Sequence, residues 1–507
     1  MIKIILLVTL VFGIFVFDAE ARVGGGDSYG GGRRSGGGSR GGWSSGSGSG
    51  YYRNNDSGII FELIYWIIRI GIRYPLFGIP FLIFLAFILY SSYRKSHSYD
   101  DYYSKYESDN TNKELNQTRD FVISLTAIDP LFSYPLFKDF IFSLYSHFHE
   151  NRGQKKLDLL SQYFSETIIN KYNRHETLLQ VDGVVVGNCQ ILSMKKTLEY
   201  LEVKIYFTAN YTELYQDGKS QRFLLKESWN LRRGLQVKSK PPESITSLAC
   251  PNCGASISET TSGKCFSCGQ SNKNGKFDWF IYDINSNKEF YSQAANSSSL
   301  LSSVVIEEGT NLPTIKDPFI EKQLATVFKD RSELEYTHKR FKDIFFNLQK
   351  SWSDQNWELA RPFESDSLFN SQLYWIEDFR RKKEKNYIEK IEVEKIVPVC
   401  IHSDNYYLSF TVRIFANMID YTKNQSGTVI RGSSSKKISF TEYWTFIKGI
   451  GSNHKDAKIK NVKNCPSCGA ELKISMAGKC DFCGTKITLG QFDWVLSQIE
   501  QDEEFNL

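Results

Sequence analysis

The chain has 507 residues and a formal net charge of +5, with 62 Lys and Arg against 57 Asp and Glu. A charge this small for the length does not favour nucleic acid as a partner, because nucleic-acid-binding domains usually carry a basic surface. The length allows three or more domains. Eight of the ten cysteines fall into two regular clusters, a usage that suits a reducing compartment.

The first 57 residues divide into two segments of different composition. Residues 1–21 are predicted to be a secretory signal, because Lys3 precedes an apolar stretch and Ala19-Glu20-Ala21 resembles a cleavage site. An uncleaved N-terminal anchor is the alternative. Residues 22–57 are rich in Gly and Ser, which predicts a disordered tether.

Two apolar segments follow the tether. Residues 58–73 predict an amphipathic helix lying in the membrane interface, because their charged side chains share one narrow stripe. That stripe consists of Glu62, Arg69 and Arg73. Residues 74–93 carry no charge, have the length of a bilayer-spanning helix and end in tyrosines, so they predict a transmembrane helix.

The membrane topology depends on the number of crossings. Arg94 and Lys95 begin a polar linker at residues 94–118. With a cleaved signal and a single crossing, everything after this point is cytoplasmic, in agreement with the positive-inside rule. If residues 58–73 also crossed, the rest of the chain would face outward. The single-pass topology with cytoplasmic C-terminal domains is the prediction.

Two four-cysteine clusters share the spacing CxxC-x11-CxxC, and the second lies 215 positions after the first (465 − 250). Their members are Cys250, Cys253, Cys265 and Cys268, and Cys465, Cys468, Cys480 and Cys483. Two CxxC pairs form a tetrahedral thiolate site for zinc, and four protein ligands leave no position for a catalytic water. We therefore predict two structural zinc ions in zinc ribbons at residues 250–290 and 465–498. Two disulfides per cluster are the alternative.

The repeat extends beyond the cysteines. Phe277-Asp278-Trp279 recurs as Phe492-Asp493-Trp494, Glu227 and Trp229 recur as Glu442 and Trp444, and Phe207 aligns with Phe415 at an offset of 208. These echoes predict two similar domains, at residues 119–249 and 318–464, with a linker at 291–317 after the first ribbon. Each domain begins with amphipathic helices and continues with strands, which predicts an α+β fold. A curved sheet wrapped by helices forms a cone with an open mouth.

The sequence shows no catalytic constellation. His147 and His149 flank Phe148 in a predicted helix and are expected to point away from its buried side. Glu227 and Glu442 allow two interpretations, an acid in a pocket or a paired residue of the sheet, and the second is favoured. Cys189 and Cys400 lie in apolar strand-like runs and are predicted to be buried thiols. We expect no enzyme, with a cone-fold enzyme for a small apolar substrate as the alternative.

The second predicted domain contains the segments DIFFNLQKSW, WELARPF and FTEYWTFIKG. Together they resemble bacterial relatives of the mitochondrial import scaffold, translocase of the inner membrane subunit forty-four. The resemblance covers residues 318–464 and, more weakly, 119–249, where ESWNL replaces EYWTF. It implies cones similar to nuclear transport factor two. The anchor, the doubled domain and the absence of a catalytic constellation predict a membrane-anchored scaffold whose concave domains bind membrane lipid and a protein or peptide partner. The resemblance adds the expectation of a role in protein transport or membrane-protein assembly.

Overall fold

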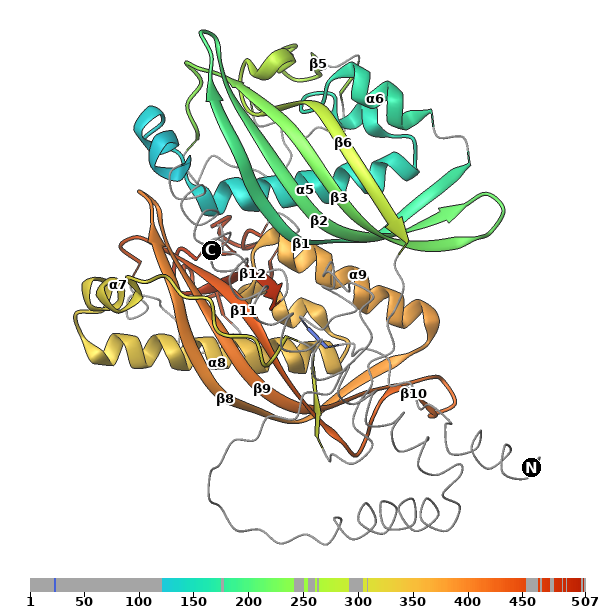
Figure 1. Cartoon of the computed structure of the whole chain (residues 1–507), viewed down its shortest axis with the longest axis vertical. Coiled ribbons are helices and arrows are strands. Elements are labelled where there is room, and N and C mark those ends of the chain that lie inside the picture. The colour runs from blue at the N-terminus through green and yellow to red at the C-terminus, as the bar shows by residue number, and fades with distance from the viewer. Residues whose placement is uncertain are drawn as a thin grey trace, which may run out of the picture. The chain divides into compact units, whose positions relative to one another are not determined.

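The computed structural model describes residues 22–23, 121–174, 177–240, 250–253, 260–261, 264–290, 304–307 and 309–452, and 464–505 with short gaps. The predicted signal, the interfacial segment, the transmembrane helix and nearly all of the tether lie outside the described residues. Within the described part of the chain, no helix is long and apolar enough to cross a membrane. The described core consists of two sheets, the first antiparallel and the second antiparallel apart from one short parallel pairing, each packed against its own helices (Figure 1).

The first half places helix α5 against a four-stranded sheet (Figure 1). Ile141, Leu144 and Phe148 of α5 are fully buried against the sheet, as their helical spacing predicts. Side chains of β3 alternate between buried and half-buried, because one face of the sheet meets the helices. The elements are α5 (Tyr134–Gly153), η1 (Leu157–Leu160), α6 (Glu166–Asn173), β1 (Leu178–Lys196), β2 (Tyr200–Tyr215), β3 (Ser220–Gly234) and β6 (Phe280–Phe290), with strand order β1-β2-β3-β6.

The second half repeats this plan with additions. Its elements are α7 (Ile320–Val327), α8 (Arg331–Ser353), η5 (Trp357–Phe363), α9 (Asp366–Lys382), β8 (Lys385–Ser403), β9 (Tyr407–Lys423), β10 (Val429–Gly432), β11 (Lys437–Gly449) and β12 (Val495–Gln501). Strand β9 lies between β8 and β11, and β12 pairs with the other side of β11. The buried side of α8 carries Phe341, Phe345 and Trp352, as its spacing predicts. The α+β prediction is confirmed in both halves.

The two halves correspond residue by residue, with an offset that changes along the chain. Lys155 and Gln355, 200 positions apart, both follow a long helix with a positive φ, 57° and 53°. In the sheets, Phe207 pairs with Glu227, and Ile414 pairs with Glu442. The equivalent of Phe207 is therefore Ile414 at an offset of 207, and the predicted match with Phe415 is wrong by one residue. Because neighbouring residues of a strand face opposite sides, this single step decides which of them is buried.

Each cysteine module is inserted between two paired strands of a sheet. Strand β6 follows the first module and pairs with β3, and β12 follows the second and pairs with β11. The predicted first ribbon, 250–290, therefore includes a strand of the preceding sheet, and most of β12 falls within the predicted second ribbon. The predicted linker also contributes a strand, since β7 (Val304–Ile306) pairs in parallel with β11. The repeating unit is a sheet with an inserted cysteine module.

Candidate metal centres and buried ionic sites

The eight clustered cysteines form two groups of four, and within each group the sulfur atoms lie within 4.8 Å of one another. The Sγ–Sγ distances are 3.8 Å for Cys250 and Cys268 and 3.7 Å for Cys253 and Cys265. A tetrahedral ion with Zn–S bonds of about 2.3 Å separates its sulfurs by about 3.8 Å, whereas a disulfide bond is about 2.05 Å long. Each group could hold one metal ion, and the geometry does not fit the disulfide alternative.

Tight turns position these sulfurs. The amide of Gly269 donates to the Cys265 carbonyl, the amide of Gly469 to that of Cys465, and the amide of Gly484 to that of Cys480, each at 2.8 Å. All three glycines have a positive φ, between 68° and 81°, a conformation that glycine adopts without strain. The CPxCG and CxxCG patterns therefore encode the turn as well as the ligands.

The two cysteines outside the clusters are Cys189 and Cys400, and both are buried. Burial raises the pKa of each thiol to about 12, so both remain protonated at neutral pH. The prediction of buried thiols is confirmed.

The first half buries a carboxylate, Glu227, at the middle of β3. The Nε2 atom of His149 lies 3.1 Å from Oε2 of Glu227, the Ser286 hydroxyl donates to Oε1 at 2.6 Å, and Trp229 Nε1 donates at 3.3 Å. Burial raises the pKa of Glu227, but His149, Ser286 and Arg152 outweigh it and hold that pKa at about 2. Burial lowers the pKa of His149, whereas the neighbouring Glu227 raises it.

The prediction that His149 points away from the core is wrong. His149 is buried and packs against Tyr145 and Tyr211 at ring-centroid distances of 4.5 Å and 4.9 Å. His149 lies four residues after Tyr145, so the two share a helix face. The buried face of α5 is wide enough to include it. The spacing from Tyr145 was the signal that could have placed it.

The second half buries the equivalent carboxylate, Glu442, and supplies a different partner. Trp444 Nε1 donates to Oε2 at 2.9 Å, as Trp229 does in the first half. The cation beside Glu442 is Arg22, whose Nη2 donates to Oε1 at 3.1 Å from 420 positions away in the sequence. Arg22 also forms two hydrogen bonds with Glu307, at 2.6 Å and 3.1 Å. Its guanidinium lies 3.6 Å from the centre of the Phe440 ring.

Burial dominates the electrostatics of Glu442. It raises the pKa to about 7; Arg22 lowers that pKa and Glu307 raises it. The two equivalent glutamates therefore have pKa values on opposite sides of the ordinary value of 4.5. Both are hydrogen-bonded residues of a sheet, which is the favoured interpretation from the sequence. Neither lines the cavity or the depression described below.

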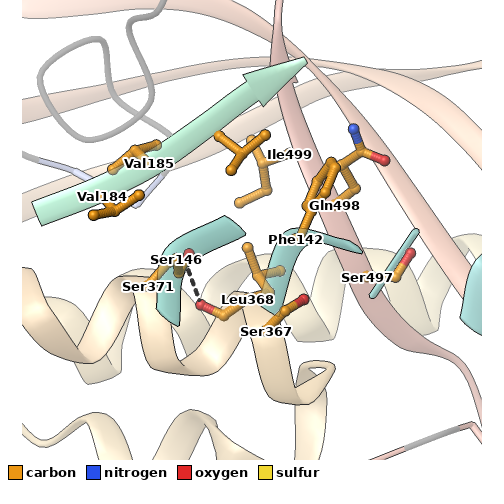
Figure 2. A pocket seen from close by; sticks show the side chains of 11 residues that line it. Phe142, Ser146, Val184, Val185, Ser367, Leu368, Ser371, Ser497, Gln498 and Ile499 are labelled. Carbon is orange, nitrogen blue, oxygen red and sulfur yellow. Dashed lines mark hydrogen bonds between the residues drawn. The ribbon is translucent and has the colours of Figure 1, made fainter. Parts of the chain in front are cut away.

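A small cavity of about 30 Å³ lies among α5, β1, α9 and β12 (Figure 2). Its lining includes Phe142, Val184, Val185, Leu368 and Ile499. Ser371 and Ser497 donate to the carbonyls of Leu368 and Thr445 at 2.8 Å and 3.0 Å, and Ser367 donates to the Asp139 carboxylate. A space of this size holds about one water, far less than the several hundred Å³ of an ordinary small-molecule site.

Comparison with known proteins identifies part of the second half. Residues 331–459 match the Tim44-like domain. This match confirms the resemblance predicted for residues 318–464. No curated protein matches the chain. A solved structure titled "Ntf2 like protein involved in plasmid conjugation" is similar at 8% identity, covering 67% of this chain and 84% of that one, with a TM-score of 0.16. A likeness this distant supports no argument about function.

The Tim44-like domain contains an open depression of about 440 Å³ at the C-terminal end of α9. Its lining includes four cationic side chains, Arg380, Lys383, Lys385 and Lys423, and one acid, Glu384, which is paired with Arg431. The ammonium groups of Lys385 and Lys423 lie 5.3 Å and 5.1 Å from the centre of the Tyr387 ring, which also lines the depression. The depression therefore combines concentrated positive charge with an amphipathic aromatic ring.

Proposed function

We propose that the protein is a membrane-anchored, non-enzymatic binding scaffold whose Tim44-like domain holds anionic lipid headgroups in the basic depression at the end of α9. The observation that carries the proposal is the set of four cations lining one open hollow within residues 331–459. Basic clusters attract anionic membrane surfaces by about 1 kcal/mol per Lys or Arg near the surface. The predicted transmembrane helix at residues 74–93 would hold the domain near such a surface.

Basic residues at a helix C-terminus also have a purely local explanation, since they offset the negative end of the helix dipole. Neighbouring residues already fill that role here. Arg381 and Lys382 pair with Asp378 at 2.6 Å each, and Arg431 pairs with Glu384. Lys385 and Lys423 lie on the adjacent strands β8 and β9, outside the helix. Their convergence with Arg380 and Lys383 goes beyond what helix capping needs.

The protein or peptide partner of the scaffold is assigned to the two α+β halves. The buried acids carry hydrogen bonds from within the chain, an arrangement that favours binding through surfaces over catalysis. Two metal ions, which we propose to be zinc, would fix the inserted modules. Each module also presents an exposed aromatic side chain, Phe266 or Phe482. Partner capture by crosslinking in intact membranes, compared between native chain and Phe266→Ser/Phe482→Ser, would show whether these rings contribute.

The lipid proposal is tested with the full chain in nanodiscs containing photoreactive phosphatidylglycerol or photoreactive phosphatidylcholine. The native chain should label preferentially with phosphatidylglycerol, and labelling should map to peptides around residues 380–387. Lys383→Gln/Lys385→Gln should reduce this labelling severalfold, and added salt should reduce it further because exposed charges are screened.

A matched control removes the same charge elsewhere. Lys195→Gln/Lys196→Gln changes two exposed lysines at the end of β1 in the first half and should leave labelling of residues 380–387 unchanged. Equal labelling by the two lipids, or equal loss in the two double variants, would show that the depression does not recognise anionic headgroups.

A further inference from the structure

Glu442 of the Tim44-like domain obtains its cationic partner from a segment outside that domain. Arg22 is fully buried, and its hydrogen bonds include two to Glu307 and one to Glu442. Val23 is also fully buried and belongs to the apolar core formed by α8, α9 and the second sheet. A dipeptide from the predicted tether therefore contributes both a charge and an apolar side chain to the second half.

The first half shows what the same position looks like without such a segment. Adding the helix offset of 200 to His149 gives Gln349, so α8 lacks the imidazole that contacts Glu227 in the first half. Gln349 instead donates from Nε2 to the Val23 carbonyl at 3.2 Å. In the first half, His149 of the long helix contacts the buried Glu227 directly. In the second half, Gln349 at the equivalent position contacts the backbone of the Arg22–Val23 segment, and Arg22 supplies the cation beside Glu442.

We propose that the Glu442 site of the Tim44-like domain is a receptor for an arginine-bearing peptide segment, and that its resident ligand is this chain's own Arg22–Val23. The recognition chemistry is specific. Two carboxylates and the Phe440 face surround the guanidinium, and a bidentate carboxylate contact with an aromatic face favours Arg over Lys. The side-chain amide of Gln349 donates a hydrogen bond to the carbonyl of Val23, the residue after Arg22. This inference names a ligand for the scaffold proposed above and rests on it only for the idea of partner binding.

The docked segment constrains the membrane topology. Cleavage after Ala21 would make Arg22 the first residue of an exported end, and a single crossing at residues 74–93 would then put the Tim44-like domain on the opposite side. The contact is impossible in that arrangement. A second copy of the chain would not help, because every copy has the same topology. The docking therefore requires an even number of crossings between residue 23 and the domain, in place of the predicted single pass with cytoplasmic domains. Two crossings, by residues 58–73 and 74–93, meet this requirement and keep the domain anchored to the membrane.

Protease protection in the full chain tests the docking directly. Trypsin cleaves after Arg, and the tether offers Arg33, Arg34 and Arg40 as internal references. In the native chain the Arg22–Val23 bond should be cut at least about tenfold more slowly than the bonds after those references, because docking hides it. Glu442→Gln should raise the rate at Arg22 on the order of tenfold, while Glu227→Gln should leave it unchanged. Equal rates at Arg22 and Arg33 in the native chain would overturn the docking.

Because Glu442→Gln could unfold the domain, a second measurement uses Arg22→Ala, which leaves the receptor intact. A synthetic peptide of residues 20–27 (EARVGGGD) should bind saturably to Arg22→Ala in detergent and raise its melting temperature. The same peptide with Ala in place of Arg should not. A peptide that binds equally with and without its arginine, or that does not bind at all, would refute the receptor. Lipid labelling at Lys383 and Lys385 is independent of both results.

The topological consequence has its own test in sealed vesicles. One epitope is inserted after Gly26 and another at the C-terminus of the full chain, and protease is added from one side. Both epitopes should be protected together or digested together. Digestion of one and protection of the other would exclude docking within the chain and restore the single-pass topology.

Discussion

The two halves place a glutamate at the same point of the same strand, two residues before a buried tryptophan, and give it opposite electrostatic surroundings. Glu227 has a pKa of about 2 because donors from its own half surround it, whereas Glu442 has a pKa of about 7 because burial prevails there. A repeated position can therefore serve as a closed structural pair in one copy and as a binding site in the other. The long helix supplies His149 and Arg152 beside Glu227 but Gln349 and Trp352 at the equivalent positions, and Glu442 takes its cation from Arg22 instead. The following predictions test this difference.

The largest loss of stability should follow removal of metal from the two proposed centres, of which each half has one. Metal analysis of the native chain should find two zinc ions, and Cys265→Ser or Cys480→Ser should each leave one. Binding of structural zinc is worth on the order of 10 kcal/mol, so chelation should unfold the inserted modules and free β6 and β12. Cys189→Ala, outside the clusters, should retain both ions. A native chain without zinc would invalidate the assignment.

The next effect separates the two halves. His149→Ala removes a donor from the buried carboxylate of Glu227 and should destabilise the first half by about 3 kcal/mol. His147→Ala, two residues away and only partly buried, is the control and should cost much less. Thermal denaturation of the full chain, with fluorescence of the buried tryptophans, measures both variants. Equal losses would mean that the His149–Glu227 contact has no special weight.

The pH dependence should differ between the halves. Folding raises the pKa of Glu442 from 4.5 to about 7. The contribution of this carboxyl to the free energy of unfolding is therefore greatest below pH 4.5, and it falls as the pH rises to about 7. The difference amounts to roughly 3 kcal/mol at 1.36 kcal/mol per pKa unit. Glu442→Gln should therefore flatten the decline of the melting temperature between pH 5 and 7. Glu227→Gln should shift the whole curve down, because the pKa of about 2 makes its contribution constant above pH 4.5. Parallel curves for the two variants would contradict the difference in pKa.

The smallest effect concerns the docked segment. Arg22 lowers the pKa of Glu442, so Arg22→Ala should move that pKa further upward. The decline in stability should then extend to a higher pH than in the native chain. Arg33→Ala, in the same predicted tether, should not change the profile. An unchanged profile in Arg22→Ala would show that the guanidinium does not contact Glu442 in solution.

Much of this architecture follows from local sequence signals. The amphipathic spacing of Phe341 and Phe345 placed α8, and the CxxC pairs gave both metal clusters. These features depend on neighbours within a few positions. The insertion of the cysteine modules between paired strands could not be predicted in this way, because only the pairing of β6 with β3 shows that the chain returns to the sheet. The one-residue error at Phe415 arose similarly, since loop lengths alone do not fix a strand's register.

The charged sites were harder to predict than the core. Glu227 and Glu442 were found as repeated residues, but their partners were not. His149 was misplaced because alternation around Phe148 suggested a solvent-facing side chain, although the face that includes Tyr145 extends to it. Arg22 gave no signal, because an arginine in a Gly/Ser-rich stretch looks like part of a solvated spacer. A contact across 420 positions depends on three-dimensional closure, which no local pattern encodes.

The insertion of each metal module between two neighbouring strands has a consequence for the newly made chain. If each module closes only around the metal ion that we propose, β6 and β12 are tied to open loops before the ion binds, and β3 and β11 each present a bare hydrogen-bonding edge. Bare edges pair with other chains and lead to aggregation. We therefore expect cells deprived of zinc to accumulate this protein in insoluble form. The amount of correctly folded protein would then depend on the supply of metal.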